Sequence, residues 1–234
     1  GGTNFGAGVF LYRSAEGGGS WTNTVKLRWN YAQDGVVNTD RVDVSVHGIE
    51  MVYVPQGSFY AGDGTAANIR GQFEAGTNGT AFLVTNEASL VLGGPSGDLG
   101  NNNTNGSAYV DDFNDTASQV LPPEYPKGYN AFYCMKYEIS QGQYADFLNM
   151  LTPSQAGTRF PTNYGISRFA ISSNANVYTA DAPTRACNWI SWSDGAAYSD
   201  WAGLRPMTEL EFEKACRGPA APVASSASSM PSSG

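Results

Sequence analysis

The stretch APTRACNWISWSDGAAYSDWAGLRPMTELEFEKACRG, residues 182–218, contains two helix starts and two helix stops in close succession. Ser191 or Ser193 can cap a first helix, because a serine oxygen accepts a hydrogen bond from a free backbone N–H in the first turn. Gly203 supplies the left-handed residue that ends this helix. The inner face of the predicted helix carries Ala197, Tyr198 and Trp201.

A second helix follows at once. Thr208 and Glu211 fit the S/T-x-x-E capping box, in which hydroxyl and carboxylate each satisfy one backbone donor. Gly218-Pro219 ends the helix. Its predicted inner face carries Phe212, Ala215 and Cys216. The stretch therefore predicts two short helices joined by a tight link, with their aromatic side chains facing one core.

Composition favours a globular protein with many loops. The chain has 234 residues, 41% of them hydrophobic, with 13 Tyr, 11 Phe and 5 Trp, which suits one large domain or one domain with an appendage. Only 15% of residues are charged and 28 are Gly, so much of the chain is expected in turns. Because the aromatic content is ample for a core, disorder is excluded as the bulk state.

The charge balance excludes one class of partner. A net charge of −8 without a Lys/Arg cluster repels phosphate backbones, so nucleic-acid binding is not expected. No apolar run approaches the roughly 18 to 20 residues that a membrane span needs. The chain begins Gly1-Gly2-Thr3, which predicts a processed protein or a fragment of a longer one. Low Lys content and Asn/Gly/Ser/Thr-rich loops favour an exported, extracellular or cell-surface protein.

Cysteine and histidine are scarce. Cys134, Cys187 and Cys216 are too few and too scattered for a disulfide framework or a zinc knuckle. One disulfide plus a free thiol, or three buried thiols, both fit this pattern. His47 is the only histidine, and without partners of its own kind it is predicted to be structural or solvent-facing.

Residues 1–48 are predicted to be an all-β segment. Apolar alternation or a short apolar run marks strands at 8–13, 25–31 and 41–47, with turn signals between them. Three strands are too few to close a sandwich, so this segment either packs on the next domain or ends a β-domain that continues upstream. We favour the second alternative.

The next region mixes strands with one well-marked helix. Residues 49–55 and 58–63 flank Gln56-Gly57 and predict a β-hairpin, and residues 129–139 predict a strand. Ser140 and Gln143 form a capping box. The buried stripe of the helix that follows is predicted to contain Tyr144, Phe147, Leu148 and Leu151.

Three further segments lack hydrophobic periodicity. Residues 93–117 carry several acidic side chains, and a flexible loop of hard oxygen ligands suits calcium, whereas the alternative is a solvated insertion. The candidate ligands are Asp111, Asp112 and Asp115. Residues 158–181 are predicted to be a polar loop. Residues 219–234 are rich in Pro, Ala and Ser and predict a linker or tail.

Four strings, in order and spacing, resemble the formylglycine-generating enzyme family, which is also found in non-heme iron sulfoxide synthases and many bacterial proteins. The strings are MVYVPQGSFYAGD (Met51–Asp63), FYCMKYEISQGQYADFLN (Phe132–Asn149), NWISWSDGAAYSDWAG (Asn188–Gly203) and LRPMTELEFEKACRG (Leu204–Gly218). The resemblance covers residues 49–218. It implies an α+β fold, a loop-rich variant of the C-type-lectin fold. It also implies core and strut roles for Trp192, Trp201, Arg205, Glu209 and Phe212.

The resemblance implies that this chain lacks the catalytic residues of the enzymes in the family. The copper-binding cysteine pair of the catalytic family lies in a C-terminal half beyond the last string, so none of the three cysteines inherits that role. The iron enzymes need several histidines, and this chain has one. We therefore expect no catalytic residue and no certain cofactor. The expected function is a non-catalytic, lectin-like module for binding, adhesion or extracellular assembly.

Its expected partner is a protein or glycan on a cell surface, or further copies joined through the N-terminal strands. The alternative is that the chain is the N-terminal part of a formylglycine-generating copper oxidase or a related non-heme iron enzyme.

Overall fold

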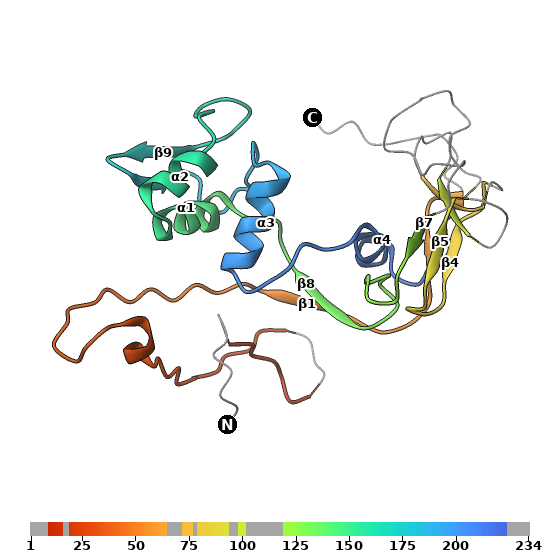
Figure 1. The fold of residues 1–234 in the computed structure, drawn as a ribbon, viewed down its shortest axis with the longest axis horizontal. Coiled ribbons are helices and arrows are strands. Elements are labelled where there is room, and N and C mark those ends of the chain that lie inside the picture. The colour runs from red at the N-terminus through yellow and green to blue at the C-terminus, as the bar shows by residue number, and fades with distance from the viewer. Residues whose placement is uncertain are drawn as a thin grey trace.

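The computed structural model describes residues 9–15, 19–64, 72–76, 79–93, 98–101 and 119–223. Within these ranges the chain is α+β, with four α-helices and ten short strands. They form a helical lobe and a strand lobe, which are joined by a two-stranded ribbon (Figure 1). No helix in the described part of the chain is long and apolar enough to cross a lipid bilayer.

The helical lobe is built on three helices and a hairpin. Its elements are α1 (Gln141–Met150), α2 (Pro153–Arg159), α3 (Trp192–Trp201), β9 (Ile171–Asn174) and β10 (Val177–Ala180). Its core consists of Tyr144, Ala145, Phe147, Leu148, Ala156, Phe169, Ile171, Tyr178 and Tyr198. Trp201 packs on this core with its ring 5.5 Å from that of Phe147. The predicted buried stripe of α1 is therefore confirmed at Tyr144, Phe147 and Leu148, while Leu151 caps its C-terminus.

Every described α-helix begins at a capping box, which fixes its start without help from packing. The pairs are Ser140 with Gln143, Thr152 with Gln155, Ser191 with Asp194, and Thr208 with Glu211. The last pair opens α4 (Glu209–Arg217). Gly203 and Gly218 have φ of 70° and 71° beyond the ends of α3 and α4. The predicted starts and stops in residues 182–218 are confirmed.

The strand lobe contains two small sheets and α4. Its strands are β2 (Phe59–Ala61), β3 (Phe73–Ala75), β4 (Phe82–Val84), β5 (Leu90–Leu92), β6 (Leu99–Asn101) and β7 (Gln119–Leu121). β2 pairs with β4, and the other four are ordered β3-β6-β5-β7. The core of this lobe consists of Phe59, Ala61, Val84, Leu92, Leu99 and Leu210. Because Leu210 lies on α4, that helix belongs to the strand lobe.

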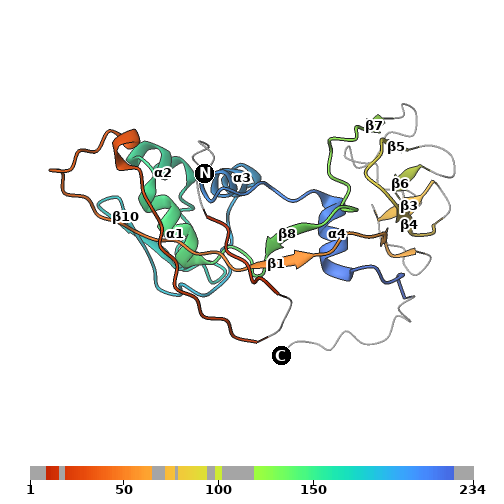
Figure 2. The ribbon, with the colours of Figure 1, turned by 90° about the horizontal axis from the view of Figure 1, so that it is seen from below.

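The ribbon between the lobes pairs β1 (Met51–Val54) with β8 (Phe132–Met135) antiparallel (Figures 1 and 2). The predicted hairpin between residues 49–55 and 58–63 is wrong, because β1 pairs with β8 and β2 with β4. Gly57 does not close a two-residue turn between these strands. Its N–H donates to the carbonyl of Tyr129 at 2.9 Å, so the chain passes from one sheet to the other.

The predicted N-terminal strands are also wrong in the described residues. Residues 9–15 and 19–50 contain no strand, and their only regular element is the 3-10 helix η1 (Tyr31–Asp34). Apolar alternation specifies a strand only where a neighbouring strand completes the hydrogen bonds, and no described segment does so here. The segment is tied to the helical lobe at His47, whose ring lies 5.2 Å from that of Trp201 and whose Nδ1 is 3.7 Å from Asp146.

Residues 158–181, predicted to be a polar loop, contain the β9–β10 hairpin and the end of α2. The hairpin turn places Ala175 and Asn176 at φ of 49° and 63°. Two successive left-handed residues give the turn whose twist suits a hairpin, and the usual Asn-Gly signal is absent here. The structure therefore contains one hairpin that residue patterns did not reveal.

Helix α4 turns a different face inward from the one predicted. Phe212 is 54% exposed and Cys216 is exposed, whereas Leu210, Glu211 and Lys214 are buried. Trp192, another predicted core residue, is 75% exposed, and the predicted strut Glu209 is exposed. The reason at α4 is that paired charges occupy its inner face, so hydrophobicity alone does not identify that face.

Candidate functional site

The predicted calcium ligands Asp111, Asp112 and Asp115 lie outside the described residues, so the structure neither assembles nor separates them. Among the described residues, no group of three or more His, Cys, Asp or Glu side chains is placed to hold a metal ion. Calcium therefore remains a prediction from sequence.

The three cysteines are free thiols. Burial raises the pKa of Cys187 to about 12. Burial also raises the pKa of Cys134, and the nearby Cys216 adds to this shift. A thiol must lose its proton to act as a nucleophile or a metal ligand. Burial therefore favours the protonated thiol at Cys134 and Cys187, the form that is neither nucleophile nor metal ligand.

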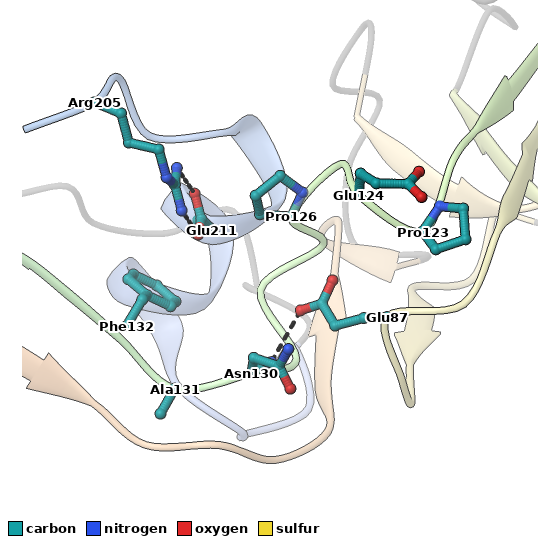
Figure 3. A pocket seen from close by; sticks show the side chains of 9 residues that line it. All are labelled: Glu87, Pro123, Glu124, Pro126, Asn130, Ala131, Phe132, Arg205 and Glu211. Atoms are coloured by element: carbon teal, nitrogen blue, oxygen red, sulfur yellow. Dashed lines mark hydrogen bonds and ion pairs between the residues drawn. The ribbon is translucent and has the colours of Figure 1, made fainter.

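The structure has a hollow of about 220 Å³ in the strand lobe, at the start of α4 (Figure 3). Its lining residues are Glu87, Pro123, Glu124, Pro126, Asn130, Ala131, Phe132, Arg205 and Glu211. Arg205 donates to both carboxylate oxygens of Glu211, at 2.8 and 2.6 Å. Glu87 accepts from the backbone N–H groups of Lys127 at 2.6 Å and of Asn130 at 2.9 Å. Two of the three carboxylates are therefore already used to hold the walls.

Two buried lysines donate hydrogen bonds to the loop of residues 122–129, which forms one wall of the hollow. The Lys127 ammonium donates to the carbonyls of Pro122 and Tyr125, at 2.6 and 2.9 Å. The Lys214 ammonium donates to the carbonyls of Gly128 and Tyr129, at 2.6 and 3.1 Å. Burial lowers the pKa of both lysines. Apart from Glu124, the charged groups around the hollow are thus engaged in contacts that hold the fold.

A second feature has the properties of a recognition surface. In the helical lobe, residues 163–169 and 185–189 form neighbouring loops that contain three non-glycine residues in the left-handed region. Ser167, Arg168 and Trp189 have φ of 48°, 69° and 63°. Such conformations cost about 1–3 kcal/mol each and persist only where surrounding contacts enforce them. Their concentration in two adjacent loops indicates that the display of these side chains is built into the fold.

Buried and half-buried side chains supply those contacts. Gln141, fully buried at the start of α1, donates to the carbonyl of Arg168 at 3.1 Å and accepts from the N–H of Ala170 at 2.9 Å. Arg185 donates to the same Arg168 carbonyl at 2.6 Å. Asn188 donates to the carbonyl of Ser167 at 2.7 Å. The turn at 167–168 is therefore held from α1 and from the 185–189 loop together.

The side chains that these loops present are exposed. Trp189 is 49% exposed although its indole N–H lies 3.4 Å from the carbonyl of Ile166. Tyr164, Ile166 and Arg168 are exposed on the neighbouring 163–169 loop. We name these four residues the aromatic loop surface. Trp, Tyr and Arg are the side chains that most often dominate the energy of protein–protein interfaces. The surface is therefore chemically suited to bind a polypeptide.

Sequence reasoning missed this surface. It interpreted residues 158–181 as a polar loop, gave core and strut roles to Trp192 and Trp201, and assigned no role to Trp189. The only signal was a set of large side chains, Tyr164, Ile166 and Trp189, in segments without helical or strand periodicity. Strain at Ser167 and Arg168 has no sequence signature, because Ser and Arg do not favour the left-handed region.

Comparison with known proteins places the chain in a family. Residues 39–227 match the family described as the sulfatase-modifying factor enzyme 1-like domain. Among curated proteins, the formylglycine-generating enzymes of Bos taurus and Mus musculus are 28% and 26% identical over 116 residues. Each alignment covers 38% of this chain and 31% of the relative, so the chain spans about a third of the length of the relatives it matches. No solved structure matches.

Proposed function

Because the chain belongs to the sulfatase-modifying factor enzyme 1-like family, we propose that it is a non-catalytic member that binds polypeptides through the aromatic loop surface. The observation that carries this proposal is the strained and fastened pair of loops that exposes Tyr164, Arg168 and Trp189. The proposal includes the C-type-lectin type of fold, in which ordered loops on a fixed core display ligand-binding residues.

A polypeptide fits the surface better than a glycan does. Trp and Tyr offer large contact areas at a small entropic cost, and an exposed Arg adds hydrogen bonds and stacking. The sequence contains no Glu-Pro-Asn or Trp-Asn-Asp motif of the calcium–sugar type. An extracellular or cell-surface location, favoured by composition, is part of the same proposal.

The absence of catalysis in the proposal is supported by thiol chemistry. An oxidase of the formylglycine-generating type needs reactive cysteines, and burial raises the pKa of Cys134 and Cys187, which disfavours their thiolate forms. Cys216 is exposed on α4, away from the core of the strand lobe. The alternative is that the chain is the first part of such an oxidase. Family membership supports it, but no described side chain adds further support.

Selection from a displayed random peptide library tests the binding site. Peptides enriched on the wild-type chain should bind Trp189→Ala at least about tenfold more weakly, because an interface tryptophan often contributes 1.4 kcal/mol or more. Phe212→Ala is the matched control, since it removes a comparably exposed aromatic ring from the strand lobe. Failure to enrich peptides, or equal binding to Trp189→Ala, would overturn the proposal. Loss of binding to Phe212→Ala alone would place the site on α4 instead.

A further inference from the structure

The N-terminal segment contains two extended arms that have no partner among the described residues. The first arm is 25–31 and the second is 41–47. The first arm precedes η1, and the second lies in the extended segment between η1 and β1 (Figures 1 and 2). In the described part of the chain, no backbone hydrogen bond is made by residues 41–49, and none by 25–29 to another backbone group. Backbone donors and acceptors are therefore available on residues 25–29 and 41–47, whereas the carbonyls of Asn30 and Tyr31 accept hydrogen bonds from the following turn.

Each arm also has one apolar row and one polar row. On the first arm Val25, Leu27, Trp29 and Tyr31 alternate with Lys26, Arg28 and Asn30. On the second, Val42, Val44 and Val46 alternate with Asp43 and Ser45. Val44 and Val46 are 71% and 77% exposed, although burial of an apolar row is what an alternating pattern provides for. Both arms thus have the side-chain pattern of a half-buried strand without the second strand.

The two arms complement each other in charge and in register. Antiparallel pairing that sets Leu27 opposite Val44 also sets Trp29 opposite Val42 and Val25 opposite Val46. The same register places Arg28 opposite Asp43. Apolar pairs and an opposite-charge pair both stabilise adjacent strands. The arms therefore suit each other better than they suit an unrelated edge strand.

Within one chain the connection between the arms opposes this pairing. The Trp29 indole donates to Asp34 at 2.6 Å, and the N–H of Val36 donates to the carbonyl of Tyr31 at 3.2 Å. A second turn follows, in which the N–H of Val37 donates to the Asp40 carboxylate at 2.9 Å. These successive turns occupy the connection between the arms, and within the chain no backbone hydrogen bond joins residues 25–29 to residues 41–47.

We infer that the arms pair with those of a second copy of this chain. The first arm of each copy lies antiparallel to the second arm of the other, which gives two equivalent two-stranded pairings related by a two-fold axis. This exchange satisfies the backbone groups of residues 41–47 and buries the valine row. It is independent of the aromatic loop surface, which lies in the helical lobe.

Sedimentation velocity of the whole chain across the micromolar range tests this inference, with hydrogen exchange of residues 41–47 measured in parallel. The wild type should form a dimer in which this arm is protected. Val44→Pro removes a strand N–H and should leave a monomer, whereas Val223→Pro, at a valine that is 88% exposed outside the arms, should dimerise normally. Unchanged circular dichroism of both variants confirms that the lobes remain folded.

Charge exchange then tests the register. Arg28→Glu alone and Asp43→Arg alone should each weaken dimerisation by about tenfold, and the double variant should restore it, because the opposite-charge pair is re-formed in reverse order. A monomeric wild type overturns the inference. It does so whether the amide hydrogens of residues 41–47 exchange rapidly or are protected by pairing of the arms within one chain. A dimer that is insensitive to Val44→Pro also overturns it.

Discussion

At the scale of single residues, buried charges determine how this fold is fastened. Lys214 lies on the inner face of α4, and its ammonium reaches two carbonyls of the loop that precedes β8. Glu211 lies three residues before Lys214, on the same face of α4, and is paired with Arg205. A pattern reading of α4 assigns lysine and glutamate to solvent and phenylalanine to the core. The reverse arrangement is stable because every buried charge has its partners.

Replacement of Lys214 by Met should lower the free energy of unfolding by about 1–3 kcal/mol, because the carbonyls of Gly128 and Tyr129 lose their donor in a buried site. Urea denaturation measures the change. Lys26→Met, at an exposed position, is the control and should shift stability by less than about 0.5 kcal/mol. Equal stability of the two variants would contradict the fastening role.

Glu211 should make the chain sensitive to acid. Burial by itself raises the pKa of this carboxyl, but hydrogen bonds from Arg205 and Thr208 outweigh it, and its pKa lies below the ordinary glutamate value of 4.5. A depressed folded-state pKa gives stability that is present above pH 4.5 and is lost as the pH falls through the folded-state pKa. Thermal unfolding between pH 3 and 6 should therefore show a shallower acid loss for Glu211→Gln than for wild type. Parallel pH profiles would show that this pair does not contribute.

At the scale of elements, helix starts could be predicted from sequence and strand partners could not. A capping box is a local motif of four residues, and both that were predicted, at Ser140 and Thr208, are present. Ser191, predicted as one of two possible N-caps, also begins a helix. Strand pairing depends on segments far apart in the chain, and β1 pairs with β8 some eighty residues away instead of with β2. The aromatic loop surface was missed for the same reason, because its loops come from residues 163–169 and 185–189.

Two glycines inside helices allow the effect of side-chain packing on stability to be distinguished from the effect of helix propensity. A Cβ added at Gly142 in α1 would lie 2.9 Å from both Cβ and O of Pro183. Gly142→Ala should therefore destabilise the chain by about 1–3 kcal/mol although Ala favours a helix. Gly195→Ala in α3, where no neighbour lies within 4 Å, should instead stabilise it by about 0.5–1 kcal/mol. Equilibrium unfolding of both variants decides the point, and a stabilising Gly142→Ala would show that α1 is not tightly packed there.

At the scale of the whole molecule, two separate cores joined by a ribbon predict uneven stability. Phe147 belongs to the helical core and Phe59 to the strand core. Truncation of a buried phenylalanine costs about 3–5 kcal/mol. Phe147→Ala should therefore accelerate hydrogen exchange mainly in α1 and β10, and Phe59→Ala mainly in β2 and β4. Uniform acceleration across both lobes would show that they unfold as one unit.

The α+β class and the family could be inferred from short sequence strings, because capped helices and their spacing are local features. The division into two lobes could not be predicted from sequence, because the order of the strings along the chain does not tell which lobe each one joins. Phe132–Asn149 begins in the ribbon and ends in the helical lobe, while Leu204–Gly218 runs into the strand lobe. The N-terminal alternation predicted strands that the described residues do not form, because no described segment pairs with them.

The central claim is that this family member binds polypeptide without oxidising it. The most direct test is to incubate the chain with a cysteine-containing peptide, a copper(I) source, oxygen and a thiol reductant, and to follow the peptide by mass spectrometry. The Bos taurus formylglycine-generating enzyme is the parallel control for the assay. The proposal predicts that this chain leaves the peptide thiol unchanged over many hours. Repeated conversion of peptide cysteine to an aldehyde by the purified chain would contradict it.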